Sequence, residues 1–342
     1  PVDTGNALEK PRGPAFIYTG NGSQWAGMGR RLLADEPEFR TAVREVDALF
    51  QRHADYSIED ELAGSQDEAP YERTEIAQPA LFAVQVGITR LLAQRGIKPQ
   101  AVAGHSVGEV AAAWASGALT LPQAVEVIYH RSRLQGMTRG QGQMTAIALD
   151  HQAARQLIDD LGLGTVLEIA GVNSSRGVTV AGDAEQLGIL ESALARADFF
   201  HKRLALDYAF HSPAMDGIEG PLKTALDELQ AGAAVHPFYS TVTGETVDGR
   251  QLNAEYWWQN IRQPVLFEAA VKAMVDDGIN VFVEIGPSPI LRSYLNDCLK
   301  DRATDGRVVA TLLRDDDSPE RIWSAACQTV IAGATHDWQI FF

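Results

Sequence analysis

The chain has 342 residues, of which 45% are hydrophobic and 22% charged, and its 29 basic and 45 acidic side chains give a formal net charge of −16. This composition excludes a disordered chain, and the acidic balance argues against general nucleic-acid binding and against a membrane-surface protein. The two cysteines, Cys298 and Cys327, exclude a disulfide framework and a cysteine-based zinc site, and we expect no bound metal. At ~150 residues per domain, the length predicts about two domains or subdomains.

The beginning of the chain predicts no targeting segment. Residues 1–10 are polar and lack the apolar core of a signal peptide. No uninterrupted apolar run approaches the ~18 residues of a membrane span. Because the chain also lacks an initiating Met, we expect it to be processed or cut from a longer protein, in a reducing cytoplasm.

Strand and helix patterns alternate through the first part of the chain. Residues 1–14 contain Pro and Gly and are predicted to form a linker. Apolar residues repeat at helical spacing over 39–50 and 77–88. Short buried strands are predicted over 15–19 and 101–103.

The middle of the chain follows a different rhythm. In chain order, its predicted elements are a strand over 144–149, a helix over 151–161, strands over 166–172 and 177–181, a helix over 184–196 and a strand over 201–206. The order β-α-β-β-α-β is that of the split βαβ, or ferredoxin-like, unit. Since strands follow again over 281–285 and 308–312, and a helix over 319–331, we expect this unit to be inserted into a larger α/β domain.

A nucleophile motif lies between the predicted strand over 101–103 and a helix. Gly104-His105-Ser106-Val107-Gly108 fits G-x-S-x-G in the strand–turn–helix context of a nucleophile elbow. The glycines permit the sharp turn that exposes Ser106, and the amide of Val107, at a helix N-terminus, is a natural oxyanion donor. The alternative is a Gly-rich turn with an incidental Ser.

These patterns together predict an α/β fold class with two subdomains. A large α/β-hydrolase-like subdomain is expected over residues 15–140 and 207–312. A small ferredoxin-like subdomain is expected over 141–206. Residues 313–342 are predicted to be a C-terminal helix and a post-domain linker.

A serine nucleophile needs a base, and His211 is the best placed of the eight histidines. It follows the last strand of the insert and precedes the helix start at Ser212-Pro213, so it lies at the junction of the two subdomains. The alternative is a structural His at a helix entry. His105 adjoins Ser106, but a neighbour in an elbow points away from the nucleophile, which favours a local structural role. No acidic third member stands out; Asp207 is near His211 without further support.

One arginine lies on an apolar helix face. The helix is predicted to begin with the capping box of Thr120 and Gln123, and Arg131 follows Val127 by four residues on the apolar stripe, whereas Arg133 lies off it. A buried guanidinium needs an anionic partner. That partner is either an internal Asp or Glu, or the carboxylate of a substrate bound in a pocket.

With these residues assembled, the chain resembles an acyltransferase domain of a type I polyketide synthase, which is similar to malonyl-CoA:acyl carrier protein transacylases. The resemblance runs from about residue 15 to residue 338. It rests on the joint order of separate motifs: Gly20-Asn21-Gly22-Ser23-Gln24-Trp25, Gln78-Pro79-Ala80, Gly104-His105-Ser106-Val107-Gly108-Glu109, Arg131, Tyr208-Ala209-Phe210-His211, Trp258-x-Asn260 and Glu284-Ile285-Gly286-Pro287.

The resemblance implies a Ser106/His211 dyad that works by a ping-pong mechanism. Acyl-CoA acylates the Ser, and the phosphopantetheine thiol of an acyl carrier protein then takes the acyl group; no permanently bound cofactor is implied. A backbone carbonyl is expected to orient the His, and it maps onto Asn260. Arg131, 25 positions after the Ser, falls where the family places its carboxylate-binding arginine.

The resemblance also implies an oxyanion hole and a pocket. The amides of Val107 and Asn21 are the expected oxyanion donors, although the family usually has Gln at position 21. Gln78 and His105 are candidates to line the pocket.

The substrate implied by the resemblance is malonyl-CoA. In the family, a hydrophobic residue after the Ser, here Val107, accompanies malonyl. The tetrad Tyr208-Ala209-Phe210-His211 is a hybrid of the malonyl and methylmalonyl patterns. We give Phe210 the most weight because its ring fills the space that an α-methyl group needs. A methylmalonyl or other α-substituted unit is the alternative.

The sequence is also compatible with two functions of other classes. A serine hydrolase, such as an editing thioesterase, shares Ser106 and His211 but has no need of Arg131. A non-catalytic docking domain is disfavoured because all three residues are intact.

The expected partners are CoA, an acyl carrier protein and neighbouring synthase domains such as a ketosynthase. CoA and the carrier protein are anionic although this chain is acidic, so local patches must attract them. His201-Lys202-Arg203 and Arg30-Arg31 are candidates, with solvated surface charge as the alternative.

Overall fold

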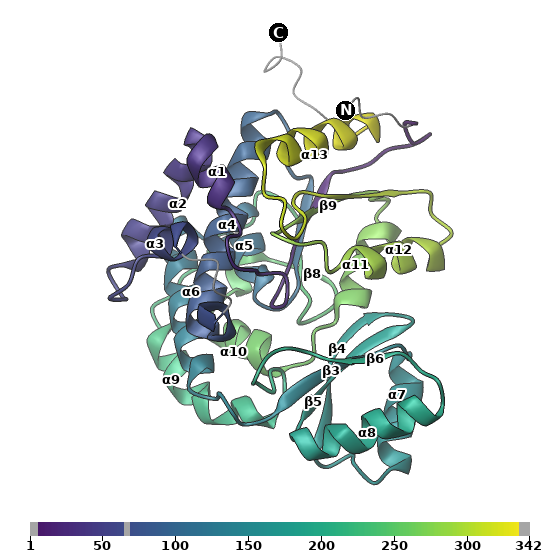
Figure 1. The fold of residues 1–342 in the computed structure, drawn as a ribbon. Coiled ribbons are helices and arrows are strands. Elements are labelled where there is room, and N and C mark those ends of the chain that lie inside the picture. Colours follow the sequence, from purple (N-terminus) through teal and green to yellow (C-terminus); the bar gives the residue numbers. More distant parts are fainter. Residues whose placement is uncertain (1–5, 65–68, 335–342) are drawn as a thin grey trace.

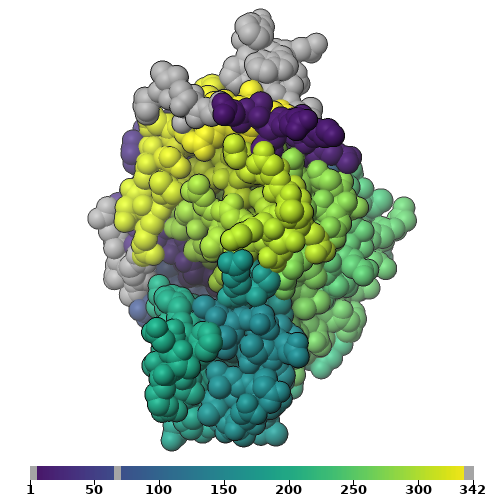
Figure 2. Space-filling view, turned by 90° about the vertical axis from the view of Figure 1, so that its right-hand side faces the viewer, coloured from purple at the N-terminus to yellow at the C-terminus, as the bar shows by residue number. Residues whose placement is uncertain are grey.

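The computed structural model describes residues 6–64 and 69–334 and divides them into two subdomains (Figure 1). The predicted tail beyond residue 334 and residues 1–5 of the predicted linker lie outside the described residues. In Figure 2 the small subdomain is the teal lobe beneath the larger body.

The large subdomain is built on a six-stranded sheet in the order β10-β9-β1-β2-β7-β8. The strands are β1 (Ala15–Tyr18), β2 (Ala101–Gly104), β7 (Phe238–Tyr239), β8 (Thr246–Val247), β9 (Val281–Ile285) and β10 (Arg307–Ala310). All neighbours are parallel except β7 and β8. The predicted strands over 15–19, 101–103, 281–285 and 308–312 are confirmed to within two residues.

Helices cover both faces of this sheet, as its alternating side chains require. Phe16 and Tyr18 pack into one core cluster, while Ala15 and Ile17 pack into another. The first cluster includes side chains of α2 (Pro37–Phe50), α4 (Thr74–Gln94), α5 (Gly108–Ala115), α6 (Leu121–Gly136), α10 (Ala254–Arg262) and α13 (Pro319–Ile331). The second includes α11 (Phe267–Asp276) and α12 (Arg292–Asp301). The other described helices of the large subdomain are α1 (Arg30–Asp35), α3 (Ile58–Ala63) and α9 (Glu219–Ala225), with 3₁₀ turns at Ala69–Glu72, Pro213–Ile218 and Gly249–Gln251.

Helix α4 is apolar enough to resemble a membrane span. Among the described residues it is the one helix that is long and apolar enough to cross a membrane, with a mean hydropathy of 1.4 over 18 residues. However, 89% of that window is buried inside the fold. The helix therefore packs as the central core helix of the large subdomain.

The small subdomain has the predicted β-α-β-β-α-β order. Its elements are β3 (Gln143–Ile147), α7 (His151–Asp160), β4 (Leu167–Ser174), β5 (Gly177–Gly182), α8 (Ala184–Arg196) and β6 (His201–Arg203). The four strands form an antiparallel sheet in the order β4-β5-β3-β6, which is the ferredoxin-like arrangement. Alternate residues such as Ile169 and Val180 pack with α7 and α8, whereas Ala146, Ala170 and Thr179 line a cavity between the subdomains.

Three details differ from the predicted organisation. Strand β6 ends at Arg203 rather than at residue 206, because the Leu206 N–H bonds the Leu204 carbonyl in a turn that bends the chain along the cavity. Helix α1, which was not predicted, precedes the predicted helix over 39–50. Within the predicted linker, Leu8 is buried against Val281 and Ala332, so this segment packs on the large subdomain.

Candidate active site

The nucleophile elbow has the geometry that its glycines permit. Ser106 lies between β2 and α5 with φ 53°, a left-handed conformation that is strained for a residue with a Cβ. A Cβ on Gly104 would lie 2.2 Å from the Glu109 nitrogen, and one on Gly108 would lie 2.3 Å from the Tyr18 carbonyl oxygen. Both positions therefore require glycine, and the turn brings Ser106 to the carboxyl end of the parallel strands, where α/β sheets bind ligands.

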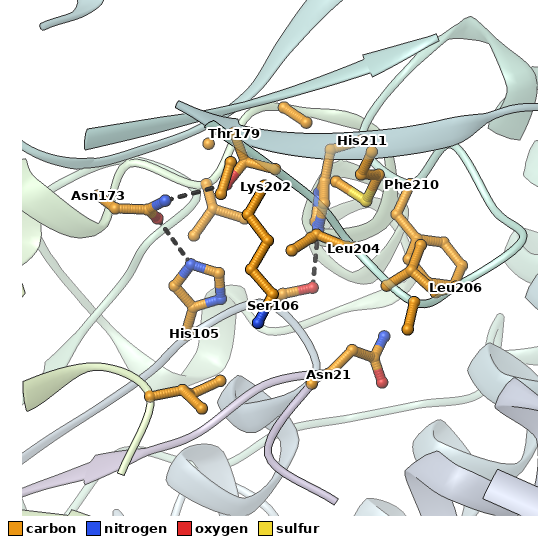
Figure 3. A pocket seen from close by; sticks show the side chains of 18 of the residues that line it. Asn21, His105, Ser106, Asn173, Thr179, Lys202, Leu204, Leu206, Phe210 and His211 are labelled. Atoms are coloured by element: carbon orange, nitrogen blue, oxygen red, sulfur yellow. Dashed lines mark hydrogen bonds between the residues drawn. The ribbon is translucent and has the colours of Figure 1, made fainter. Parts of the chain in front are cut away.

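Ser106 and His211 are in direct contact (Figure 3). The Ser106 Oγ lies 2.7 Å from the His211 Nε2, and both side chains are buried. His211 has φ 58°, so the second member of the pair also occupies a strained backbone conformation. The two residues are 105 positions apart in the chain. The predicted junction of the subdomains thus places the base against the nucleophile.

A backbone carbonyl orients the histidine, but not the one that was expected. The His211 Nδ1 lies 2.9 Å from the carbonyl oxygen of Gln263. Since a carbonyl can only accept, Nδ1 carries the proton and Nε2 is free to accept the Ser106 hydroxyl proton. The assignment to Asn260 is wrong: Asn260 lies inside α10, whereas Gln263 follows the helix with an extended ψ of 156°. Asp207 is half exposed and pairs with Arg139 instead.

Acylation is expected to remain active well below the ordinary titration range of histidine. Burial, and then the positive Arg131, lower the pKa of His211 to about 3. The imidazole is therefore neutral, and able to act as base, throughout the range in which an unperturbed His near pH 6.5 would become protonated. We expect kcat/KM for Ser106 acylation to stay level from pH 7.5 to about pH 5. A fall centred near pH 6.5, measured by rapid-quench acylation, would contradict this.

Arg131 is confirmed on the buried face of α6. The helix begins with the predicted capping box of Thr120 and Gln123. The guanidinium donates from Nε to the Asn260 Oδ1 at 3.1 Å, and from Nη1 to the side-chain oxygens of Gln78 and Gln135, each at 2.7 Å. Its Nη2 lies 3.1 Å from the Ser106 Oγ. Within the described residues no carboxylate bonds this guanidinium, so of the two sequence alternatives a directly paired internal acid is excluded.

A cavity of about 570 Å³ opens above the dyad, between the subdomains. It is lined by Asn21, His105, Ser106, Phe210 and His211, among others. Its walls come from both subdomains: Asn21 follows β1, His105 and Ser106 follow β2, and Lys202 belongs to β6. A site at such a junction matches the ordinary location of ligand pockets.

Three residues expected at the pocket lie behind its wall. Gln78 is fully buried and accepts a hydrogen bond from Arg131 instead of lining the cavity. Tyr208 stacks on Phe210, with ring centroids 4.9 Å apart and planes at 10°, and its hydroxyl accepts from the Thr74 N–H at 3.3 Å. Val107 is buried at the start of α5. Tyr208 therefore acts on the cavity through the ring of Phe210.

His105 bonds away from the nucleophile, as expected for an elbow neighbour. Its Nε2 lies 2.8 Å from the Asn173 Oδ1 on β4, and the Asn173 Nδ2 donates to the Thr179 Oγ1 at 3.1 Å (Figure 3). The ring thus lines the cavity and ties the elbow to the small subdomain.

Three functional neighbours were missed by reading the sequence. Gln263 carries no signal, since every residue has a carbonyl. Gln135 was hidden in the polar remainder of α6. Glu109 did carry a signal, because a lone carboxylate precedes the apolar run Val110-Ala111-Ala112-Ala113, and it is fully buried.

A serine on a nucleophile elbow, bonded to a carbonyl-oriented histidine, defines a protein of the serine acyl-transfer class. The chain belongs to the acyl transferase domain family, whose model matches residues 15–335. The resemblance inferred from the motifs is thereby confirmed.

Curated relatives are much longer than this chain. It is 38% identical over 331 residues to the polyketide synthase GfsA of Streptomyces halstedii, covering 96% of this chain but 4% of that protein. It is 35% identical to the erythronolide synthase EryA3 of Saccharopolyspora erythraea, covering 99% of this chain and 11% of that protein.

Solved structures share the fold. The acyltransferase domain from module 8 of the salinomycin polyketide synthase is 34% identical with a TM-score of 0.91, over 96% of this chain and 77% of that one. The loading acyltransferase of the avermectin synthase is 33% identical with a TM-score of 0.88, over 92% of this chain and 99% of that one. A malonyl CoA-acyl carrier protein transacylase from Clostridium perfringens, 20% identical with a TM-score of 0.81 over 93% of this chain and 97% of that one, shares the fold.

Proposed function

We propose that this acyltransferase loads a malonyl extender unit from malonyl-CoA onto the phosphopantetheine thiol of an acyl carrier protein, within polyketide biosynthesis. The observation that carries the proposal is the buried guanidinium of Arg131, whose Nη2 lies 3.1 Å from the Ser106 Oγ without a carboxylate on it in the described chain. A charged donor beside the nucleophile suits an acyl group that ends in a carboxylate. A simple serine hydrolase has no need of it.

The first half-reaction forms an ester on Ser106. The His211 Nε2 takes the hydroxyl proton as Oγ attacks the thioester carbonyl, and the carbonyl oxygen becomes an oxyanion. The amides of Val107 and Asn21 are the proposed donors to it, the former favoured by the N-terminus of α5. The carbon–sulfur bond then breaks, and CoA leaves with the proton from His211.

The second half-reaction reverses these steps with a new thiol. The phosphopantetheine thiol gives its proton to His211 and attacks the ester carbonyl. The carbon–oxygen bond breaks, and the Ser106 Oγ takes the proton back from His211. Arg131 holds the malonyl carboxylate through both halves.

Phe210 supports malonyl over α-substituted units. Its ring lines the cavity and is held by stacking on Tyr208, so it cannot turn aside freely for an α-methyl group. A misfit of one methyl group costs about 1–3 kcal/mol, so selection rather than complete exclusion is expected. Methylmalonyl, which the Tyr208 position of the hybrid tetrad favours, is the second candidate. The acyl transferase domain of SpnD, 26% identical with a TM-score of 0.83 over 95% of this chain and 79% of that one, was solved with a substituted malonyl compound.

The proposed macromolecular partners are a carrier protein and neighbouring synthase domains, with a ketosynthase first among them, in the cytoplasm. Of the two basic patches, Arg30-Arg31 is partly engaged, since Arg31 lies 3.7 Å from Glu320 of α13. Arg203 is paired with Glu191 at 2.6 Å. Exposed Lys202 lines the cavity mouth and is the better candidate to meet an anionic partner.

Intact-protein mass after incubation with equal malonyl-, methylmalonyl- and acetyl-CoA tests the proposal. We expect a dominant malonyl adduct that is discharged by a phosphopantetheinylated carrier protein. A dominant methylmalonyl adduct overturns the weight given to Phe210. Release of CoA without an adduct favours the hydrolase, and neither adduct nor release favours a docking domain.

A further inference from the structure

Three hydrogen-bond donors and one shared hydroxyl surround the buried carboxyl group of Glu109, three residues after the nucleophile. Its Oε1 accepts from the backbone N–H of Thr241 and lies 3.0 Å from the Thr241 hydroxyl, whose single proton is shared with the Gly104 carbonyl, also at 3.0 Å. Its Oε2 accepts from the Tyr256 hydroxyl at 2.9 Å and from the Asn260 side-chain amide at 2.8 Å. A buried carboxylate is tolerated only with such donors, and the first turn of α5 adds a favourable dipole.

The amide of Asn260 joins this carboxylate to the arginine. Its Nδ2 donates to Glu109 and, at 3.2 Å, to the backbone carbonyl of Ser106, while its Oδ1 accepts from the Arg131 Nε. A reversed amide would set donor against donor at Arg131 and acceptor against acceptor at Glu109. The two charged side chains therefore fix the orientation of Asn260.

Glu109 supplies a counter-charge to Arg131 through the neutral Asn260 amide, without bonding the guanidinium directly. Burial lowers the pKa of Arg131 to about 9, and an ionised Glu109 acts in the opposite sense. Burial raises the pKa of Glu109 itself to about 7, against the hydrogen bonds from Thr241, Tyr256 and Asn260, which lower it. A direct ion pair would take the N–H groups that a substrate carboxylate needs. In this structure Asn260 accepts a hydrogen bond only from the Arg131 Nε, and the Arg131 Nη2 remains 3.1 Å from the Ser106 Oγ.

We propose that Glu109 and Asn260 are positioning residues that hold Arg131 in line with the acyl group on Ser106 and so set the preference for a charged over a neutral acyl chain. This inference rests on the proposed function, in which Arg131 binds the acyl carboxylate. Neither residue touches the substrate; both act through the guanidinium.

Glu109→Gln tests the proposal because the substitution reverses the amide network. The backbone N–H of Thr241 cannot move, so the single side-chain oxygen of the new Gln must accept from it. The Gln NH₂ group then faces the Asn260 side chain, and Asn260 must turn its own NH₂ group toward Arg131. We expect kcat/KM for acylation by malonyl-CoA to fall at least about tenfold, and by acetyl-CoA less than about threefold. Glu284→Gln neutralises an equally buried carboxylate on β9 and is the control; its malonyl-to-acetyl ratio should stay within about twofold.

Arg131→Ala and the double variant Glu109→Gln/Arg131→Ala separate this proposal from the function on which it rests. We expect the double variant to lose no more malonyl activity than Arg131→Ala, since Glu109 acts through the same guanidinium. Equal loss with both acyl donors in Glu109→Gln, or additive losses in the double variant, overturns the positioning role. An unchanged ratio in Arg131→Ala instead overturns the role of Arg131 itself.

A second variant guards against a folding defect. Asn260→Ala keeps both charges but removes the amide between them, together with its bond to the Ser106 backbone carbonyl, and we expect the same selective loss of malonyl acylation. Acetyl loading and thermal unfolding report whether each variant retains a competent Ser106–His211 pair. If both variants lose acetyl loading, the network is a folding element, and the proposal is rejected.

Discussion

Ser106→Ala is expected to abolish the acyl adduct on this protein. The only hydroxyl bonded to the His211 Nε2 in the described structure is removed, so no ester can form and no acyl group can pass to a second thiol. His211→Ala is expected to retain the nucleophile but to slow acylation by about 10²–10⁴-fold, the ordinary contribution of a general base. Single-turnover quench with radiolabelled malonyl-CoA measures both variants.

A neighbouring serine gives the matched control for the nucleophile. Ser132 on α6 is as buried as Ser106, and its hydroxyl donates to the Tyr129 carbonyl at 3.1 Å. Ser132→Ala should therefore keep the adduct and its rate within about threefold. An adduct that persists in Ser106→Ala at the wild-type rate would falsify the assignment of the nucleophile.

Arg131→Ala is expected to change which acyl group is accepted. Loss of a charge-assisted, fork-shaped donor beside Ser106 should lower kcat/KM for malonyl-CoA by about 10²-fold. Acetyl-CoA has no carboxylate for Arg131 to bind, so its use relative to malonyl-CoA should rise. Competition between the two CoA esters, read by intact mass, gives the ratio directly.

Two further substitutions calibrate that result. Arg131→Lys keeps the positive charge but not the planar fork, so an intermediate loss is expected. Arg133 is exposed on the same helix, and Arg133→Ala should leave the malonyl-to-acetyl ratio unchanged. If Arg131→Ala behaves like Arg133→Ala, the malonyl carboxylate is bound elsewhere and the proposed function fails.

Local patterns were sufficient for most of the elements and for the nucleophile elbow, whereas the assignment of His211 as the base rested on the family resemblance. The β-α-β-β-α-β order of the small subdomain follows from period-two and helical apolar spacing, because each strand or helix must bury one face. The elbow at Ser106 follows from two glycines at positions where any Cβ would collide with backbone. The inward face of Arg131 follows from its place on the apolar stripe of α6.

Contacts between distant parts of the chain were decided only by the tertiary structure. Arg131 lies 129 positions from Asn260, and the Oγ–Nε2 bond joins residues 105 apart. The pattern on α6 indicates that the guanidinium is buried, but it fits an internal acid and a substrate carboxylate equally well as the partner. Packing of α10 against the elbow placed the Asn260 amide on the Arg131 Nε and left Nη2 beside Ser106.

The orientation of His211 shows most clearly which features follow from the sequence and which follow only from the tertiary structure. The sequence determined that a histidine returns to the junction of the subdomains, since residue type and order are enough for that. The carbonyl that holds it belongs to Gln263, because α10 ends one residue earlier and leaves that oxygen outside the helix. Every residue carries an identical carbonyl, so only the path of the backbone distinguishes the one that acts.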